Sequence, residues 1–390
     1  MKTLLPLFLL ISSPLLRAVE ISTDREDALY DVGDEVTFTI AAAEGAEIAW
    51  SLSMDGFGKL DEGKGAVAKG SLDQPGFLML TAVVTGADGK KVTKYAAAGI
   101  APTKIPLSTE VPDDFDEFWA AQKKKLAESP MEITTSPANA EDGIEAVDIQ
   151  IQAEAGGPPV SGYFAKPSNA ESKSLPAVLW VHGAGVRSSS LPQAVNGAQR
   201  GFLSMDINAH GIPNGKSGDF YKELSSGELK TYRHDGRESR DTIYFRGMIL
   251  RLVRAIDFLT SRPEWDGKVM AVIGHSQGGL QALAAGGLDD RVTFIGSGVP
   301  AGCDHTGMLA DRISGWPKLV PLLENGKPDP KVVEAVRYID AVNFATRCNA
   351  EAILSAGFID RVCPATSVYA AYNALPGKKQ MINKPAMGHA

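Results

Sequence analysis

Two hydrophobic patterns divide the chain, and the first covers residues 19–101. Apolar and polar side chains alternate over residues 36–40, and a longer apolar run covers residues 77–84. Alternation with a period of two is typical of a strand with one buried face. Turn-forming pairs such as Asp55-Gly56 separate these runs. The pattern predicts a small all-β domain of the immunoglobulin-like sandwich type over residues 19–101.

A different pattern begins after residues 102–112, which we interpret as a linker. Short, continuous apolar runs now alternate with longer segments in which apolar residues recur every three or four positions, as over residues 249–259. Apolar strands that alternate with helices indicate a mostly parallel sheet covered on both faces, here over residues 113–390. The expected strands lie at residues 177–181, 202–205, 269–273, 292–295, 352–356 and 380–382.

The first 18 residues have the layout of a secretory signal peptide. Lys2 is followed by an apolar run over residues 4–11, and Ala18 offers a small residue for cleavage. A transmembrane anchor needs about 20 uninterrupted apolar residues, and Pro14 and Arg17 interrupt this run. We therefore expect a secreted or periplasmic protein without a membrane anchor, in which residues 1–18 are the leader.

Composition narrows the classes of partner and cofactor. The 390 residues include 39 Lys and Arg against 47 Asp and Glu, for a net charge of −8. This acidic balance argues against nucleic acid as a partner. Three cysteines, Cys303, Cys348 and Cys363, allow at most one disulfide and leave its pairing open, and we favour three buried thiols. No Cys/His spacing is typical of zinc, so we expect neither metal nor cofactor.

A candidate nucleophile lies directly after one expected strand. Residues 274–278 read Gly-His-Ser-Gln-Gly, follow the apolar run at residues 269–273 and precede an apolar helical stretch. In this strand–turn–helix context, G-x-S-x-G places a serine on a sharp turn, where only small residues fit two positions to either side. The motif is common by chance, but its position after a buried strand favours Ser276 as a nucleophile.

A serine nucleophile needs a base and an acid that orients the base. In α/β-hydrolases the acid and then the histidine follow the serine along the chain. His389 is the predicted base because it follows the last expected strand, whereas His305 comes before the favoured acid. Asp360 is the predicted acid because it comes just past an expected strand. The rival candidate, Asp340, lies in a helical stretch.

Two backbone amides are expected to stabilise the negative charge of a tetrahedral intermediate. One is the amide of Gln277, directly after the nucleophile, and the other is that of Ala184, in the loop after the strand at residues 177–181. We interpret His182 as a residue that braces this loop. His210 lies close to the expected site, where contact with substrate and bracing of a loop are equally open interpretations.

Four motifs carry a resemblance to a known family. They are Val-Pro-Asp-Asp-Phe-Asp-Glu-Phe-Trp at 111–119, Gly-His-Ser-Gln-Gly at 274–278, Tyr-Ile-Asp-Ala-Val-Asn-Phe-Ala at 338–345 and Gly-Phe-Ile-Asp-Arg-Val-Cys-Pro at 357–364. With them, residues 111–389 resemble the acetyl xylan esterase / cephalosporin C deacetylase family, carbohydrate esterase family seven, which has the α/β-hydrolase fold. The resemblance implies the triad Ser276, Asp360 and His389, with oxyanion donors at Ala184 and Gln277.

The chain departs from the family pattern near the expected site. Asn208-Ala209-His210 stands where the family usually has Arg-Gly-Gln, and Ala184 stands where a tyrosine is frequent. These positions bear on the acyl pocket and on substrate preference. Relatives in the family assemble into oligomers, so a homo-oligomer is an open expectation.

The resemblance implies a secreted serine esterase that removes acetyl groups from acetylated sugars, such as xylan fragments. Two alternatives stay open. One is an α/β-hydrolase that acts on other sugar esters or on peptides, suggested by the altered residues 208–210. The other is a non-catalytic carbohydrate-binding protein in which the β domain carries the function.

Overall fold

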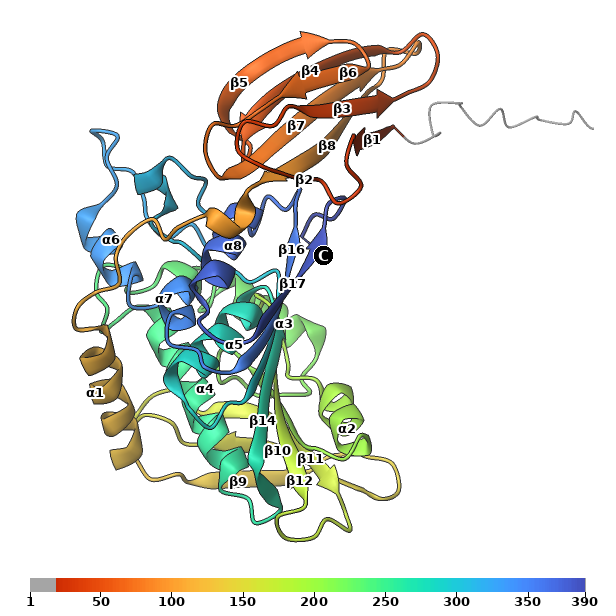
Figure 1. Cartoon of the computed structure of the whole chain (residues 1–390). Coiled ribbons are helices and arrows are strands. Elements are labelled where there is room, and N and C mark those ends of the chain that lie inside the picture. Colours follow the sequence, from red (N-terminus) through yellow and green to blue (C-terminus); the bar gives the residue numbers. More distant parts are fainter. Residues whose placement is uncertain (1–18, 390) are drawn as a thin grey trace, which may run out of the picture. The chain divides into compact units, whose positions relative to one another are not determined.

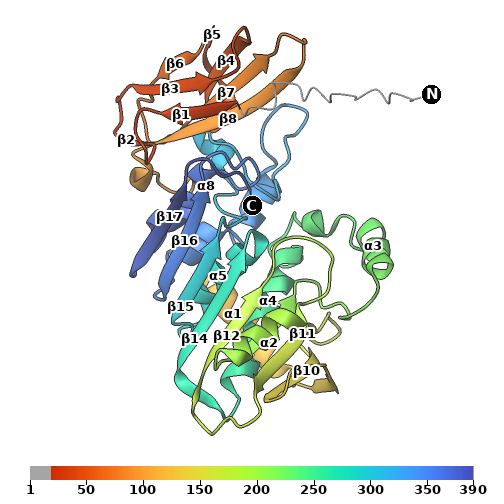
Figure 2. The ribbon, with the colours of Figure 1, turned by 90° about the vertical axis from the view of Figure 1, so that its right-hand side faces the viewer.

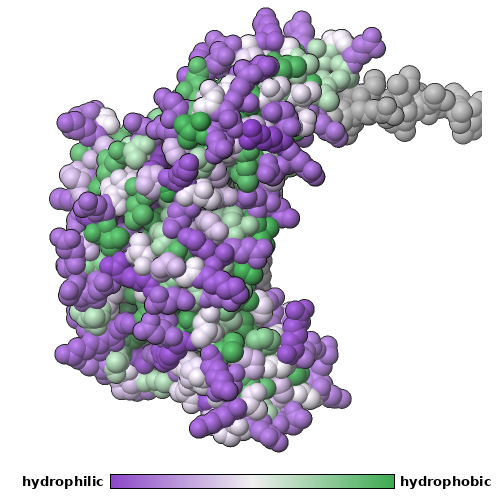
Figure 3. Space-filling model, viewed as in Figure 1, coloured by the Kyte–Doolittle hydropathy of each residue, from purple (hydrophilic) through white to green (hydrophobic). Residues whose placement is uncertain are grey.

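The computed structural model describes residues 19–389, so the predicted signal peptide lies outside the described residues. The chain forms two compact units, one up to Pro102 and one from Thr103 onward (Figure 1). Within residues 19–389 there is no helix of the length and apolarity that crossing a membrane requires. On the face drawn in Figure 3, hydrophobic residues lie in small groups between hydrophilic ones, as on most globular proteins.

The first unit consists of two β-sheets that enclose an apolar core. Phe38, Leu52, Leu80 and Ile100 are among its fully buried side chains. The strand orders are β1-β3-β6 and β2-β8-β7-β4-β5. The two predicted runs lie in β3 and β7, and the immunoglobulin type of this unit stays a prediction. The strands are β1 (Glu20–Thr23), β2 (Leu29–Tyr30), β3 (Val36–Ala41), β4 (Glu47–Met54), β5 (Phe57–Lys64), β6 (Val67–Gly70), β7 (Gly76–Thr85) and β8 (Lys91–Ile100).

The second unit is built on one nine-stranded sheet in the order β17-β16-β15-β14-β12-β13-β11-β10-β9. The predicted apolar runs all lie within or overlap strands of this sheet, which confirms them as strands. The strands are β9 (Ile133–Pro137), β10 (Ile144–Ile151), β11 (Val160–Pro167), β12 (Leu175–Val181), β13 (Leu203–Asn208), β14 (Trp265–His275), β15 (Phe294–Gly298), β16 (Glu351–Gly357) and β17 (Lys379–Lys384).

The sheet is mixed rather than uniformly parallel. The pairings from β13 through β12, β14, β15 and β16 to β17 are parallel, and those among β9, β10, β11 and β13 are antiparallel. Short loops join β9 to β10 and β10 to β11, and such loops can connect only antiparallel neighbours. The expected parallel arrangement therefore holds for the part of the sheet that carries the G-x-S-x-G turn.

Helices cover the two faces of this sheet unequally. On one face α5 packs on β14 and β15, and α8 packs on β16, whereas α2 packs on β10, β11 and β13 (Figure 2). The α-helices are α1 (Phe115–Glu128), α2 (Leu191–Gln199), α3 (Gly218–Ser226), α4 (Tyr244–Thr260), α5 (Gln277–Leu288), α6 (Pro330–Val336), α7 (Ala341–Ala345) and α8 (Ala365–Ala374). The described residues also contain the 3₁₀ turns η2 (Pro102–Lys104), η3 (Tyr232–His234) and η4 (Gly307–Ala310).

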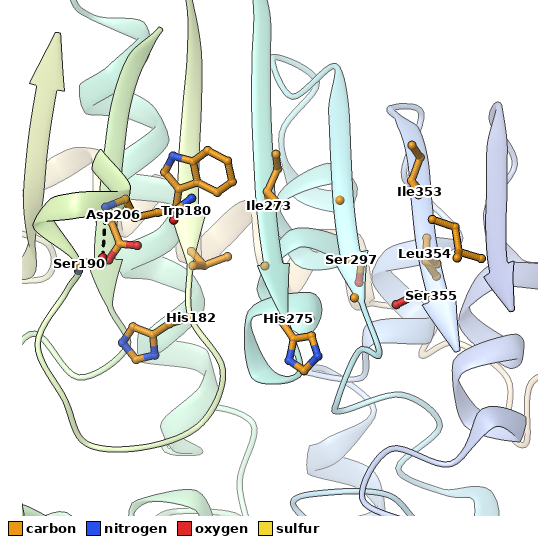
Figure 4. Close-up of a pocket in the computed structure, with 16 residues that line it drawn as sticks. Trp180, His182, Ser190, Asp206, Ile273, His275, Ser297, Ile353, Leu354 and Ser355 are labelled. Carbon is orange, nitrogen blue, oxygen red and sulfur yellow. Dashed lines mark hydrogen bonds between the residues drawn. The ribbon is translucent and has the colours of Figure 1, made fainter. Parts of the chain in front are cut away.

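The face away from α5 is only partly covered. On this face Trp180 of β12 lies beside Ile273 of β14, and Gly296 of β15 separates Ile273 from Ile353 of β16; these residues line a cavity of about 490 Å³ (Figure 4). They are half-buried, whereas Leu179 and Val272, one residue earlier in their strands, are fully buried on the α5 side. The prediction that helices cover both faces therefore holds fully for one face only. On the other face α2 packs mainly on β10, β11 and β13, so the part with Trp180, Ile273 and Ile353 stays half-open.

Candidate active site

Ser276 lies on a tight turn between β14 and α5. Its backbone has a positive φ, with φ 57° and ψ −118°, a conformation that costs energy for any residue with a side chain. A Cβ atom at Gly274 would overlap the backbone of Gly278, and one at Gly278 would overlap the carbonyl oxygen of Val181. Glycine is thus required at both positions for steric reasons, which explains the G-x-S-x-G spacing.

Gly278→Ala should destabilise this turn strongly. The new methyl group would meet a main-chain oxygen of β12, and neither strand nor helix can move without breaking sheet contacts. We expect the free energy of unfolding to fall by about 3 kcal/mol, the upper end for a single substitution. Urea denaturation of parent and variant measures this loss. Gly218→Ala is the matched control, because a Cβ atom there meets nothing within 4 Å; equal losses in the two variants would contradict the prediction.

Three side chains that are far apart in the sequence meet at this turn. His389 Nε2 lies 3.0 Å from Ser276 Oγ, and His389 Nδ1 lies 2.8 Å from Asp360 Oδ2. Asp360 is 1% exposed, and its other oxygen accepts hydrogen bonds from the amides of Val362 and Cys363. The carboxylate is thereby held in one orientation toward the imidazole, the geometry that a serine–histidine–acid relay needs.

The rival residues Asp340 and His305 lie together in another environment. The buried Asp340 carboxylate accepts hydrogen bonds from the amides of Asp304, His305 and Val342 and caps α7. Burial raises the pKa of Asp340 to about 7 and lowers that of His305 to about 3. This arrangement joins a turn to the start of a helix, and it leaves Asp360 as the carboxylate hydrogen-bonded to His389.

One predicted oxyanion donor directly follows the nucleophile, and the other lies in a segment that lines the same cavity. Ala184 and Ser276 line the same cavity, and a Cβ atom placed on Gly183 would lie 3.4 Å from Ser276 Cβ. Gln277 is the first residue of α5, and the first four amides of a helix have no partner within it. Both segments can therefore present N–H groups to an oxygen bound beside Ser276 Oγ.

His210 joins these two segments through an aromatic cluster that no sequence motif indicated. The buried His210 ring contacts Gly185 O through Nε2 at 3.3 Å and Tyr244 Oη through Nδ1 at 2.8 Å. The His210 and Tyr232 rings pack edge to face, with their centroids 4.6 Å apart, and the Tyr232 hydroxyl donates to the side-chain oxygen of Gln277. These contacts favour bracing over substrate contact for His210. Only the departure at residues 208–210 marked this position, and nothing marked the tyrosines.

His210 should also make the stability of the protein sensitive to acid. Burial, with Arg251 nearby, lowers its pKa from 6.5 to about 4, so between these values the unfolded chain binds a proton that the folded chain does not. At pH 5 this residue should therefore cost on the order of 2 kcal/mol of stability relative to pH 7.5. Urea unfolding at both pH values should show a correspondingly smaller loss for His210→Gln, whose side chain does not titrate. The same loss in both proteins would exclude this role.

The cavity around Ser276 has a volume of about 540 Å³. Val181, Trp316 and Val362 form apolar parts of its wall. It is distinct from the cavity of Figure 4, although Val181, His182 and His275 line both.

The structure also shows where the three cysteines lie and which side chains have metal-ligand spacing. The three cysteines are free and buried, which confirms the interpretation as buried thiols. Among residues 19–389, one group of side chains has metal-ligand spacing: the donor atoms of Asp360, Cys363 and His389 lie within 4.8 Å of one another. Asp360 and His389 are already hydrogen-bonded to each other, so this group coincides with the serine–histidine–acid arrangement.

Comparison with known proteins gives consistent results. The family model "Acetyl xylan esterase (AXE1)" matches residues 106–390. The acetyl esterase Axe7A of Xylanibacter ruminicola is 30% identical over 380 residues, which cover 93% of this chain and 84% of that protein. The structure of the acetyl xylan esterase from Paenibacillus sp. R4 is similar with a TM-score of 0.63 and 25% identity, over 74% of this chain and 93% of that one.

A second solved structure supports the fold. Acetyl xylan esterase 1 from Thermoanaerobacterium sp. JW/SL YS485 has a TM-score of 0.57 and 23% identity, over 74% of this chain and 92% of that one. With the mixed sheet, these likenesses confirm the prediction of an α/β-hydrolase-type esterase fold.

Proposed function

Because the chain belongs to the acetyl xylan esterase family and is a carboxylic ester hydrolase, we propose that it removes acetyl groups from acetylated sugars of the xylan-oligosaccharide type through a serine acyl-enzyme. Family membership supports the hydrolysis of acetyl esters. The observation that carries the mechanism is the pair of contacts that join Ser276, His389 and Asp360 at 3.0 and 2.8 Å.

In this mechanism Ser276 Oγ attacks the acetyl carbonyl carbon while His389 Nε2 accepts the hydroxyl proton. Asp360 accepts a hydrogen bond from His389 Nδ1–H and so keeps Nε2 free to act as the base. His389 then donates the proton to the leaving sugar oxygen, and the acetyl group stays on Ser276. A water molecule repeats the sequence, with His389 as base, and releases acetate.

Charge stabilisation comes from the backbone around the nucleophile. The carbonyl oxygen becomes negative in the tetrahedral intermediate, and the amides of Ala184 and Gln277 donate to it. Gln277 opens α5, a helix of 12 residues, whose positive N-terminal end further favours this charge. The His210–Tyr232–Tyr244 cluster holds the two donor segments in place through its contacts with Gly185 and Gln277.

Acetate release from acetylated xylo-oligosaccharides tests the proposed function. The purified protein should release acetate from these substrates and from 4-nitrophenyl acetate, and should cleave butyryl esters and aminoacyl amides much more slowly. A preference for aminoacyl amides would instead support the peptidase alternative. Glycan binding without labelling by a fluorophosphonate probe would support the non-catalytic alternative.

We also propose that the protein is exported and cleaved after Ala18. The charged, apolar and small-residue segments of residues 1–18 support this. N-terminal sequencing of the protein recovered from a secreting host should give Val19 as its first residue, and an intact Met1 would exclude cleavage.

A further inference from the structure

One permanently charged side chain lines the cavity around Ser276. This side chain is Arg187, which shares the cavity wall with three histidines and with apolar residues. Within the described part of the chain, no aspartate or glutamate lines this cavity. The cavity is therefore locally basic in a protein whose net charge is −8.

The guanidinium group of Arg187 lies close to the nucleophile. Its Nη2 donates to the carbonyl oxygen of Gly183 at 3.2 Å. A Cβ atom placed on Gly183 would lie 3.4 Å from Ser276 Cβ and 3.9 Å from Arg187 Nη2. The arginine and the serine thus flank the same glycine, so an ester bound at Ser276 comes within reach of the guanidinium.

Most of the hydrogen-bonding capacity of Arg187 is unused. A guanidinium has five N–H donors, and among residues 19–389 the Gly183 carbonyl is the hydrogen-bond acceptor of Arg187. No described carboxylate pairs with it at ion-pair distance, and its charge acts only at longer range on the buried Asp206, whose pKa it lowers against the larger opposite effect of burial. Arg246 and Arg312, by contrast, are paired with Glu154 and Asp304. Arg187 is exposed and can bind an external carboxylate through two parallel hydrogen bonds.

We propose that Arg187 is a specificity-determining residue that binds the carboxylate of a uronic acid unit on the acetylated saccharide. The inference rests on the proposed function, because it uses the same nucleophile and cavity. An acetyl group has no ionisable atom, so an anion recognised here must belong to the alcohol part of the ester. In the xylan-type saccharide of the proposed function that part is a sugar chain, and a carboxylate carried by a sugar branch of such a chain is that of a uronic acid. The net negative charge of the protein does not attract such a substrate, so a local contact must provide the preference.

The test compares two acetylated xylo-oligosaccharides of equal length, with and without a glucuronic acid branch. The measured quantity is the ratio of their kcat/KM values for acetate release. We expect a ratio of about 10 for the parent, the effect of one charged hydrogen-bonded contact, and a ratio near 1 for Arg187→Gln. Arg187→Lys should keep part of the preference because it keeps the charge. Arg200→Gln, a change at an exposed arginine at the end of α2, should keep all of it.

Each ratio compares two substrates with the same enzyme sample. Partial misfolding, or a shift of the loop at Gly183, lowers kcat/KM for both substrates alike and therefore cancels in the ratio. A parent ratio of 1 or below, or an unchanged ratio in Arg187→Gln, would overturn the inference. Failure of the proposed function would look different: neither saccharide nor 4-nitrophenyl acetate would release acetate.

Discussion

Ser276→Ala is expected to lower kcat for acetyl ester hydrolysis by at least about 10⁴-fold. In the proposed mechanism Ser276 Oγ attacks the carbonyl. The variant lacks this atom, and His389 Nε2, 3.0 Å from Oγ in the parent, then has no hydroxyl proton to accept. The rest of the site, including the amides of Ala184 and Gln277, stays in place. Residual catalysis should come from these proposed oxyanion donors and from binding alone.

Acetate release and fluorophosphonate labelling measure this effect together. The parent should become labelled on Ser276, and the variant should not. Ser226→Ala, which changes an exposed serine at the end of α3, is the matched control and should retain full activity and labelling. If Ser276→Ala keeps a tenth of the parental activity at an unchanged melting temperature, another nucleophile carries the reaction.

Asp360→Asn is expected to lower kcat by about 10³- to 10⁴-fold. The carboxylate accepts from the amides of Val362 and Cys363 and also faces His389 Nδ1. An asparagine has one acceptor oxygen and one donor nitrogen, so it cannot satisfy both the amides and the imidazole. If its oxygen stays with the amides, its NH₂ group faces Nδ1, which favours the tautomer that carries the proton on Nε2 and removes the base.

Asp340→Asn is the control that separates the two rival acids. Asp340 is also buried and accepts hydrogen bonds from three backbone amides, but it holds a turn and caps α7. This variant should lose stability, measured by urea denaturation, while its kcat per folded molecule stays within about tenfold of the parent. A larger loss of kcat in Asp340→Asn than in Asp360→Asn would reverse the assignment of the acid.

The local pattern of apolar residues was sufficient to predict many of the strands. The apolar runs predicted β12 to β16 because a strand buried in a parallel sheet must be apolar on both sides, whereas β17, an edge strand whose residues alternate in burial, was predicted from the short stretch at residues 380–382. It was not sufficient for β9, β10 and β11, whose antiparallel pairing follows from their short connections. Nor did it predict the half-open face lined by Trp180, Ile273 and Ile353, because the position of α2 depends on contacts between distant segments.

The sequence by itself determined the strands that carry the site and the candidate chemistry: a serine between glycines after a buried strand, then an aspartate after a later strand and a histidine near residue 389. Each of these predictions depends on local backbone preferences or on the order of residues along the chain, and both can be read directly from the sequence. Only the tertiary structure decided that Ser276 and Asp360 both contact His389, that His210 braces the loop at Gly185, and that Arg187 faces the cavity without a carboxylate partner. Such contacts join residues from separate strands and loops, and packing alone determines which of them meet.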